Sequence, residues 1–283
     1  MAIVIRSGEL TVTINEAGAE VCSVKNKKDE EYIWQADPAI WARHAPVLFP
    51  IVGKLKEDHF LYSNKKFTLP QHGFARDNKF KLIKKDDQCC IFELTSSDET
   101  RKHYPFSFEF QIEYILSSNK LQVNYTVMNP GNEVMLFSLG AHPGFMVEGM
   151  EEYFLEFDKD ELLLSGLQNG LLSSQTEKLI LKDKKLPLKK ELFDKDALIF
   201  ENSQINNVLL CSSRTGRKIT MKCEQWPYFG IWSKKGCNSF VCLEPWYGIT
   251  DTIDTDQQLK NKKGIIQLSP QKTFSCSFEL IFD

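Results

Sequence analysis

The sequence has little net charge and no long apolar run. Its 35 lysines and arginines nearly balance its 38 aspartates and glutamates, so the formal net charge is −3. That balance gives no general attraction to nucleic acid or to anionic lipid. The first ten residues hold only a short apolar tetrad, Ala2 to Ile5, and no later run approaches the ~18 apolar residues of a membrane span. We therefore expect a cytoplasmic protein without nucleic-acid or membrane partners.

The common sequence motifs for cofactors and metals are also absent. The sequence contains no phosphate loop G-x-x-x-x-G-K-[ST], no G-x-G-x-x-G, no H-E-x-x-H and no G-x-S-x-G. Its 8 cysteines include the adjacent pair Cys89 and Cys90 and the more distant pair Cys237 and Cys242, and neither pair has C-x-x-C spacing. We interpret these thiols as small buried hydrophobic groups. We expect no cofactor and no metal.

Apolar and polar residues alternate along much of the chain. The alternation runs through residues 106–114, 121–127 and 274–280, and through Leu10, Val12 and Ile14. Successive side chains of a strand point to opposite faces, so this pattern predicts antiparallel strands with one buried face. Aromatic residues make up 12% of the chain, which also favours strands. The pattern predicts an all-β fold, a large antiparallel β-sandwich with a few short helices, in a single domain over residues 1–283.

The predicted helices are short. Asp37 before Pro38 is a typical helix start and predicts a turn or two of helix through Trp41. Ser96 or Ser97 predicts the start of another, which must end before Pro105. Residues 187–193 predict a third.

Three short segments combine residue types that can carry chemistry. They are Pro-Gln-His-Gly-Phe-Ala-Arg-Asp at 70–77, Gly-Ala-His-Pro-Gly-Phe at 140–145, and Leu-Glu-Pro-Trp at 243–246. His72 and His142 stand beside Gly or Pro where a strand ends, a position at the rim of a sandwich. Glu244 follows an apolar run, so its carboxylate is either paired structurally or desolvated and more basic, as a general base requires. Taken singly, each of the three residues also has a structural interpretation.

Taken together and in order, the H-G-F-A-R, A-H-P-G-F and L-E-P-W segments resemble the galactose mutarotase (aldose 1-epimerase) superfamily, in particular its LacX-like branch. The likeness extends from about Ile14 to the C-terminus. It implies a β-supersandwich, in agreement with the alternation. It also implies an isomerase that interconverts the α and β anomers of a free aldose by opening its ring.

The resemblance implies a role for each residue of the three segments. Glu244 would be the general base that takes the proton of the anomeric hydroxyl, and His142 the general acid that protonates the ring oxygen. These roles require an ionised Glu244 and a protonated His142 in the active form. His72 would hydrogen-bond near the ring oxygen and hold the sugar. This chemistry needs no nucleophile, metal or cofactor.

Substrate-binding residues are carried over from the family less directly. An acidic residue that grips sugar hydroxyls is matched to Asp196, with Asp194 as its rival, and Arg76 is a plausible sugar contact. Many relatives have Gly-Arg where this chain has Gly53-Lys54. A lysine there lacks the planar fork of arginine, and the alternative is an exposed lysine after a turn. Trp226, Trp232 and Trp246 are either platforms for the sugar or packing residues, and we assign substrate contact to Trp232 and Trp246.

Several functions remain open from the sequence. The substrate is expected to be a neutral aldose, with hexose 6-phosphate as the alternative. A non-catalytic carbohydrate-binding protein on the same fold is the second class. A metallohydrolase using His72, His142 and Glu244, and a glycoside hydrolase using Asp196 and Glu244, are less favoured. The expected partner is a small sugar, and the protein is a monomer or a homodimer.

Overall fold

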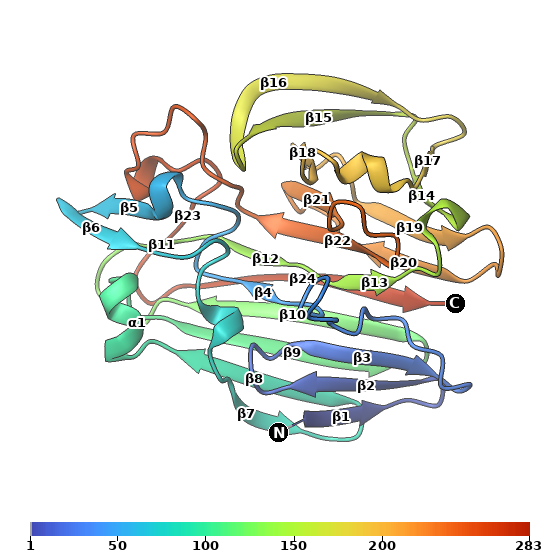
Figure 1. Ribbon diagram of the computed structural model, residues 1–283. Helices are drawn as coiled ribbons and strands as arrows, with labels where there is room; N and C mark the ends of the chain where they lie inside the picture. The colour runs from blue at the N-terminus through green and yellow to red at the C-terminus, as the bar shows by residue number, and fades with distance from the viewer. Residues whose placement is uncertain (1) are drawn as a thin grey trace.

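The computed structural model describes residues 2–283, which form mainly antiparallel sheets (Figure 1). The nine-stranded sheet consists, in spatial order, of β17 (Lys185–Pro187), β14 (Tyr153–Phe157), β19 (Asn207–Ser212), β20 (Lys218–Lys222), β24 (Thr273–Phe282), β10 (Lys120–Met128), β9 (Glu109–Ser117), β8 (Cys89–Thr95) and β7 (Lys81–Lys85). The eight-stranded sheet consists of β16 (Leu171–Ile180), β15 (Glu161–Gln168), β18 (Leu198–Glu201), β21 (Tyr228–Trp232), β22 (Phe240–Tyr247), β12 (Leu139–Ala141) and β4 (Val47–Leu48), with β13 (Gly144–Met146) also paired to β22.

Smaller elements surround these two sheets. A three-stranded sheet contains β1 (Ala2–Arg6), β2 (Leu10–Asn15) and β3 (Val21–Asn26), and two strand pairs are formed by β5 (His59–Tyr62) with β6 (Lys65–Thr68) and by β11 (Met135–Phe137) with β23 (Ile266–Leu268). The helices are α1 (Asp98–His103) and the 3₁₀ segments η1 (Lys56–Asp58), η2 (Ala75–Asp77), η3 (Met150–Glu152), η4 (Lys190–Phe193) and η5 (Leu259–Asn261). The prediction of a large antiparallel β-sandwich with a few short helices is confirmed. Within residues 2–283, no helix is long and apolar enough to span a membrane.

The two large sheets share one hydrophobic core. Phe110 and Leu121 of the nine-stranded sheet and Val241 and Leu243 of the eight-stranded sheet belong to the same buried cluster. The three-stranded sheet also contributes to that cluster, for example through Val12. Because one cluster joins all three sheets, we propose that residues 1–283 form a single domain.

Strand β22 has two buried faces with different neighbours. Val241 and Leu243 face the main core, whereas Cys242 and Trp246 belong to two smaller clusters on the opposite face. Glu244 lies between the latter two in the period-two pattern, so it shares their face. The Glu244 carboxyl group therefore lies between these two small apolar clusters, on the face of β22 that borders the cavity described below.

The predicted strands agree with the structure apart from their ends. Strands β2, β10 and β24 occupy the alternating segments, but β9 begins at Glu109, so Phe106 and Phe108 precede it. Both phenylalanines are nevertheless buried in the core. The alternation reports which side chains are buried more directly than it reports where the hydrogen-bonded strand begins.

Two of the helix predictions differ from the structure. Helix α1 follows Ser97 as predicted, because the Ser97 side chain accepts a hydrogen bond from the Thr100 N–H and the Thr100 hydroxyl accepts one from the Ser97 N–H. The helix after Asp37 was predicted wrongly: the Asp37 backbone oxygen accepts hydrogen bonds from Ile40 N (3.0 Å) and Trp41 N (2.8 Å), and only a turn forms. In residues 187–193, only Lys190–Phe193 is helical.

A buried ion pair holds together the loops beside β22. Lys262 and Asp251 are nearly fully buried, and Lys262 Nζ lies 2.8 Å from Asp251 Oδ1 and 2.6 Å from the Ile249 backbone oxygen. The other carboxylate oxygen of Asp251 accepts a hydrogen bond from Lys56 N (2.9 Å). The pair therefore joins the segment after β22 to the segment at residues 53–56.

Replacing Lys262 with methionine is expected to destabilise the protein by about 3–5 kcal/mol, because Asp251 would stay buried without its counter-charge. Urea unfolding measures this change. Lys260→Met, on the exposed neighbouring lysine, is the control and is expected to change stability by less than about 0.5 kcal/mol. Equal effects of the two substitutions would contradict the role of the pair.

Candidate active site

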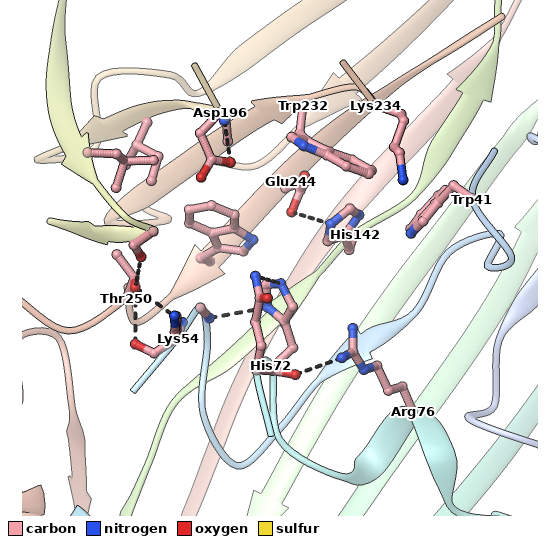
Figure 2. Close-up of a pocket in the computed structure, with 17 residues that line it drawn as sticks. Trp41, Lys54, His72, Arg76, His142, Asp196, Trp232, Lys234, Glu244 and Thr250 are labelled. Carbon is pink, nitrogen blue, oxygen red and sulfur yellow. Dashed lines mark hydrogen bonds and ion pairs between the residues drawn. The ribbon is translucent and has the colours of Figure 1, made fainter. Parts of the chain in front are cut away.

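A cavity of about 430 Å³ opens on the face of β22 that carries Glu244 (Figure 2). Its size lies within the range of small-molecule sites. The sequence-predicted site residues all line it: Lys54, His72, Arg76, His142, Asp196, Trp232, Glu244 and Trp246. Other lining residues include Lys234, whose sequence position between Trp232 and Glu244 makes it a candidate cation near the substrate, and Trp41, Gln71 and Thr250, to which the sequence assigned no site role. The structure thus brings the three sequence segments to one place, while the roles of their residues stay predictions.

The sheet register places His142 opposite Glu244. Strand β12 pairs Gly140 with Trp246, and β13 pairs Gly144 with Cys242. Continuing either register by two residues sets His142 across from Glu244. His142 Nε2 lies 3.2 Å from Glu244 Oε2, and both side chains are buried. The contact is an ion-pair distance and not an aligned hydrogen bond, since Glu244 Oε2 has no hydrogen-bond partner among the described residues. Two segments about a hundred residues apart in sequence therefore supply a proton donor and a proton acceptor in direct contact.

Burial sets the proton affinities of this pair. Desolvation raises the pKa of Glu244 well above 4.5 and lowers the pKa of His142 from 6.5 to about 3. Both shifts favour the neutral forms, so the pair holds one proton and keeps it on Glu244. The sequence-based expectation of an ionised Glu244 beside a protonated His142 concerns the active form and stays a prediction, whereas burial favours the neutral pair in the sugar-free protein.

His72 is a neutral hydrogen-bonding group. Its Nδ1 accepts a hydrogen bond from Gly53 N (3.2 Å), which leaves the ring proton on Nε2. Gln71 Nε2, 3.2 Å from His72 Nε2, is itself a donor, so it does not accept this proton. Burial holds the pKa of His72 well below 6.5. Its ring centroid lies 5.6 Å from that of His142 at an angle of 88°. His72 can therefore donate a hydrogen bond within the cavity without carrying charge.

Three cationic side chains line the cavity, from separate segments. Arg76 donates to the Gln71 backbone oxygen (2.7 Å), while its Nε is buried without a hydrogen-bond partner among the described residues. Burial lowers the pKa of Arg76 to about 10, which leaves it charged at neutral pH. Lys54 is held through its backbone N–H, which donates to Thr250 Oγ1 (3.1 Å), and Lys234 stands at the exposed end of the cavity.

Asp196 and not Asp194 lies at the cavity. Asp196 is among the lining residues, and its Oδ1 accepts a hydrogen bond from Ala197 N (2.8 Å). The Asp194 carboxylate lies 3.9 Å from Lys235 Nζ instead. Of the rival assignments, only Asp196 is placed to contact a bound sugar.

Two glycines create the seat of Trp246. A Cβ at Gly230 would lie 2.4 Å from Trp246 Cη2, and one at Gly140 would lie 2.7 Å from Trp246 Cδ1. The indole can therefore lie flat on the sheet beside Glu244, and its buried side chain interacts with the Glu244 carboxyl group, which lowers the pKa of Glu244 against the larger effect of burial. Trp226, by contrast, is a core residue whose Nε1 donates to the Ser277 backbone oxygen (2.8 Å).

Among the described residues, one group of side chains lies close enough together to hold a metal ion. Ligand atoms of His142, Cys242 and Glu244 all lie within 4.8 Å of one another. Cys242, which shares the Glu244 face of β22, takes the place that the sequence analysis considered for His72. Burial raises the pKa of the Cys242 thiol well above 9.0, which opposes formation of the thiolate that a metal requires.

Comparison with known proteins identifies the family. A family model described as aldose 1-epimerase matches residues 1–266. The chain belongs to the aldose 1-epimerase family. Among curated relatives, the plasmid-encoded protein LacX of Lactococcus lactis subsp. lactis is 31% identical, and the alignment covers 99% of each chain.

Solved structures of related proteins have the same fold. A galactose mutarotase related enzyme from Lactobacillus acidophilus is 37% identical, with a TM-score of 0.95 over 100% of this chain and 97% of that one. A galactose mutarotase-like protein from Lactobacillus casei is 31% identical, with a TM-score of 0.95 over 100% of both chains. The membership predicted from the three sequence segments is confirmed, as is the LacX likeness.

The buried carboxyl group predicts a pH-dependent stability. Because the folded-state pKa of Glu244 lies above 4.5, its stabilising contribution is present below about pH 4.5 and is lost as the pH rises towards the folded pKa. The glutamine of Glu244→Gln does not titrate, so the variant does not lose stability in this way as the pH rises. Its free energy of unfolding is expected to increase steadily relative to that of the unchanged protein from roughly pH 4 to pH 8. Chemical unfolding across this range measures the difference, with Glu161→Gln, on the surface, as control. Parallel curves for Glu244→Gln and the unchanged protein would contradict the raised pKa.

Gly230→Ala is expected to push the Trp246 indole into the cavity, since the new Cβ would overlap the ring. Sugar binding should weaken by roughly tenfold or more while the fold is retained, because about 1.4 kcal/mol of lost contact suffices for a factor of ten. Calorimetric titration with sugar measures this. Gly8→Ala, whose Cβ would meet nothing within 4 Å, is the control for the loss of a glycine. Unchanged affinity in Gly230→Ala would show that the indole is not part of the sugar site.

Proposed function

We propose that this protein is an aldose 1-epimerase that interconverts the α and β anomers of a free aldose. The observation that carries the proposal is the His142–Glu244 pair, 3.2 Å apart, buried at the wall of the one cavity that collects all the predicted site residues. Mutarotation needs a base at the anomeric hydroxyl and an acid at the ring oxygen, and this pair offers both. The 8 free cysteines support a cytoplasmic location.

The single proton of the pair is sufficient for a complete cycle. In the resting pair the proton lies on Glu244. A bound cyclic sugar places hydroxyl groups around the carboxylate, which favours transfer of this proton across the 3.2 Å gap to His142 Nε2. Glu244 then accepts the anomeric hydroxyl proton while His142 protonates the ring oxygen, and the C1–O5 bond breaks.

Ring opening returns the pair to its resting protonation. Glu244 is again protonated and His142 neutral, now beside an open-chain aldehyde. After the aldehyde rotates about C1–C2, Glu244 returns its proton to the carbonyl oxygen as His142 takes the proton of the O5 hydroxyl, and the ring closes with the other anomer. The protonation state that burial favours, with Glu244 protonated and His142 neutral, is therefore the state of the pair when the open-chain aldehyde is bound.

The other lining residues would hold the sugar. His72 Nε2–H would donate near the ring oxygen, Asp196 would accept from sugar hydroxyls, and the Trp232 and Trp246 indoles would pack on the C–H faces of the ring. Lys54 and Arg76 would hydrogen-bond hydroxyl groups away from C1. Each assignment follows the sequence-based predictions and agrees with the lining of the cavity.

Glu244→Gln is expected to lower kcat for mutarotation by 10²–10⁴-fold, because an amide of similar size cannot accept the proton. Polarimetry of freshly dissolved α-galactose measures the rate, and calorimetric titration measures the binding of sugar, which should persist. His142→Asn should cause a comparable loss, whereas His72→Asn should also raise KM. Full activity of a folded Glu244→Gln protein would overturn the mechanism. Sugar binding without any acceleration in the unchanged protein would favour a carbohydrate-binding module.

A sugar phosphate is the second candidate substrate. Lys54, Arg76 and Lys234 line the cavity and could receive an anionic substituent. Against this, Arg76 Nη2 is already bonded to the Gln71 oxygen, and Lys234 is exposed, so no bidentate arginine seat for a phosphate is formed. We therefore propose a neutral aldose such as galactose or glucose as the substrate.

For a neutral aldose, kcat/KM is expected to depend little on salt, because screening weakens only the capture of charged ligands. Anomer-exchange NMR compares galactose, glucose and glucose 6-phosphate at low and moderate salt. A marked preference for the phosphate that is lost in Arg76→Ala or Lys54→Ala would overturn the neutral substrate and leave the His142–Glu244 chemistry in place.

A further inference from the structure

Trp41 lines the cavity although it belongs to none of the three sequence segments. Its indole stacks on the His142 imidazole, with ring centroids 5.1 Å apart and planes at 29° (labelled together in Figure 2). The same indole stacks on Phe240, at 5.3 Å and 11°, and meets Trp232 at 5.5 Å and 72°. The face of Trp41 is thus held against His142 by its own aromatic support.

The backbone around Trp41 also fixes this position. The Trp41 carbonyl accepts a hydrogen bond from Trp34 Nε1 (2.8 Å). A Cβ at Gly144 would lie 2.9 Å from Trp41 Cζ3, so a glycine two residues after His142 makes room for the ring. Both observations indicate that the stack is built into the fold.

Most of the surroundings of His142 oppose a positive charge on it. Burial disfavours the imidazolium and lowers the pKa of His142, and the positive charges of Arg76 and Arg43 add to the effect, while a backbone hydrogen bond of His142 raises the pKa without outweighing burial. His72 and the thiol of Cys242 are neutral neighbours. Glu244 Oε2 lies 3.2 Å from His142 Nε2. When His142 takes up the proton in the proposed cycle, Glu244 loses it and becomes a carboxylate. The proposed cycle nevertheless passes through a charged His142.

The aromatic face of Trp41 can attract the positive charge of a protonated His142. The negative potential over an indole face attracts a cation within about 6 Å, and the attraction is stronger where water is excluded. We propose that Trp41 is a positioning residue that stabilises the imidazolium form of His142 by a cation–π interaction during ring opening. This inference rests on the proposed epimerase function and adds to it a residue that acts through His142.

Fluorinated tryptophans placed at position 41 test the proposal. Each added fluorine withdraws electron density from the ring face with little change in shape, so kcat should fall stepwise along the series. The total loss should be roughly 5- to 30-fold, while KM changes less. A purely structural role for Trp41 would give no such series. Trp41→Phe should retain more activity than Trp41→Leu.

The matched control is the same fluorinated series at Trp34. That indole is buried in the same aromatic cluster and stacks on Phe240 at 4.8 Å and 30°, and no stack with His142 occurs within residues 2–283. The kcat values of the fluorinated series at position 34 should stay unchanged. A decline at position 34 equal to that at position 41 would overturn the proposal, since the effect would then come from packing of the cluster.

A readout without turnover separates this inference from the proposed function. NMR of the His142 ring measures its protonated fraction against pH in each position-41 variant, and this fraction should fall with every fluorine. A level series, in kcat for an active enzyme or in the His142 titration, would overturn the cation–π role. Loss of activity in Glu244→Gln and His142→Asn would leave the epimerase proposal standing in that case.

Discussion

The contact between Glu244 and His142 is the interaction on which the rest of the site depends. It exists because two registers, β12 with β22 and β13 with β22, continue through the same pair of positions. The apolar clusters around β22 and the walls of the cavity remove water from both groups, so the pair keeps a single proton instead of separating into two charges. A surface pair of the same residues would be ionised and screened. Burial converts an ordinary ion pair into a proton donor and acceptor.

The surrounding structure keeps this pair dry and accessible to a ligand at the same time. Val241 and Leu243 of β22 belong to the core, and Glu244 and Trp246 of the same strand line the cavity, so one strand supplies both the hydrophobic anchor and the reactive group. Gly140 and Gly230 let Trp246 lie flat beside Glu244. The Lys262–Asp251 pair fixes the segment that carries Thr250, and Thr250 holds the backbone of Lys54. Strand β22 therefore forms one wall of the cavity, and the segments that carry Lys54 and Thr250 are held together at its edge.

Much of the fold and the site could be predicted from the sequence, for identifiable reasons. Alternation reports burial on one face of a strand, which gave the β-sandwich, and the order of three short segments pointed to the family and to His72, His142 and Glu244. The turn at Asp37 was mistaken for a helix because its local signals are the same for one turn as for several. Trp41 was missed because its contact with His142 joins residues a hundred positions apart. The protonation of the pair depends on how fully the assembled sheets exclude water, which no local pattern reports.

The most direct test of this account measures where the proton of the pair lies. The infrared difference between the unchanged protein and Glu244→Gln isolates the Glu244 carboxyl group. At neutral pH and without sugar, the account predicts a protonated carboxyl band that is absent from the variant, and this band should weaken when galactose saturates the site. A carboxylate band from Glu244 in the sugar-free protein at neutral pH would contradict it.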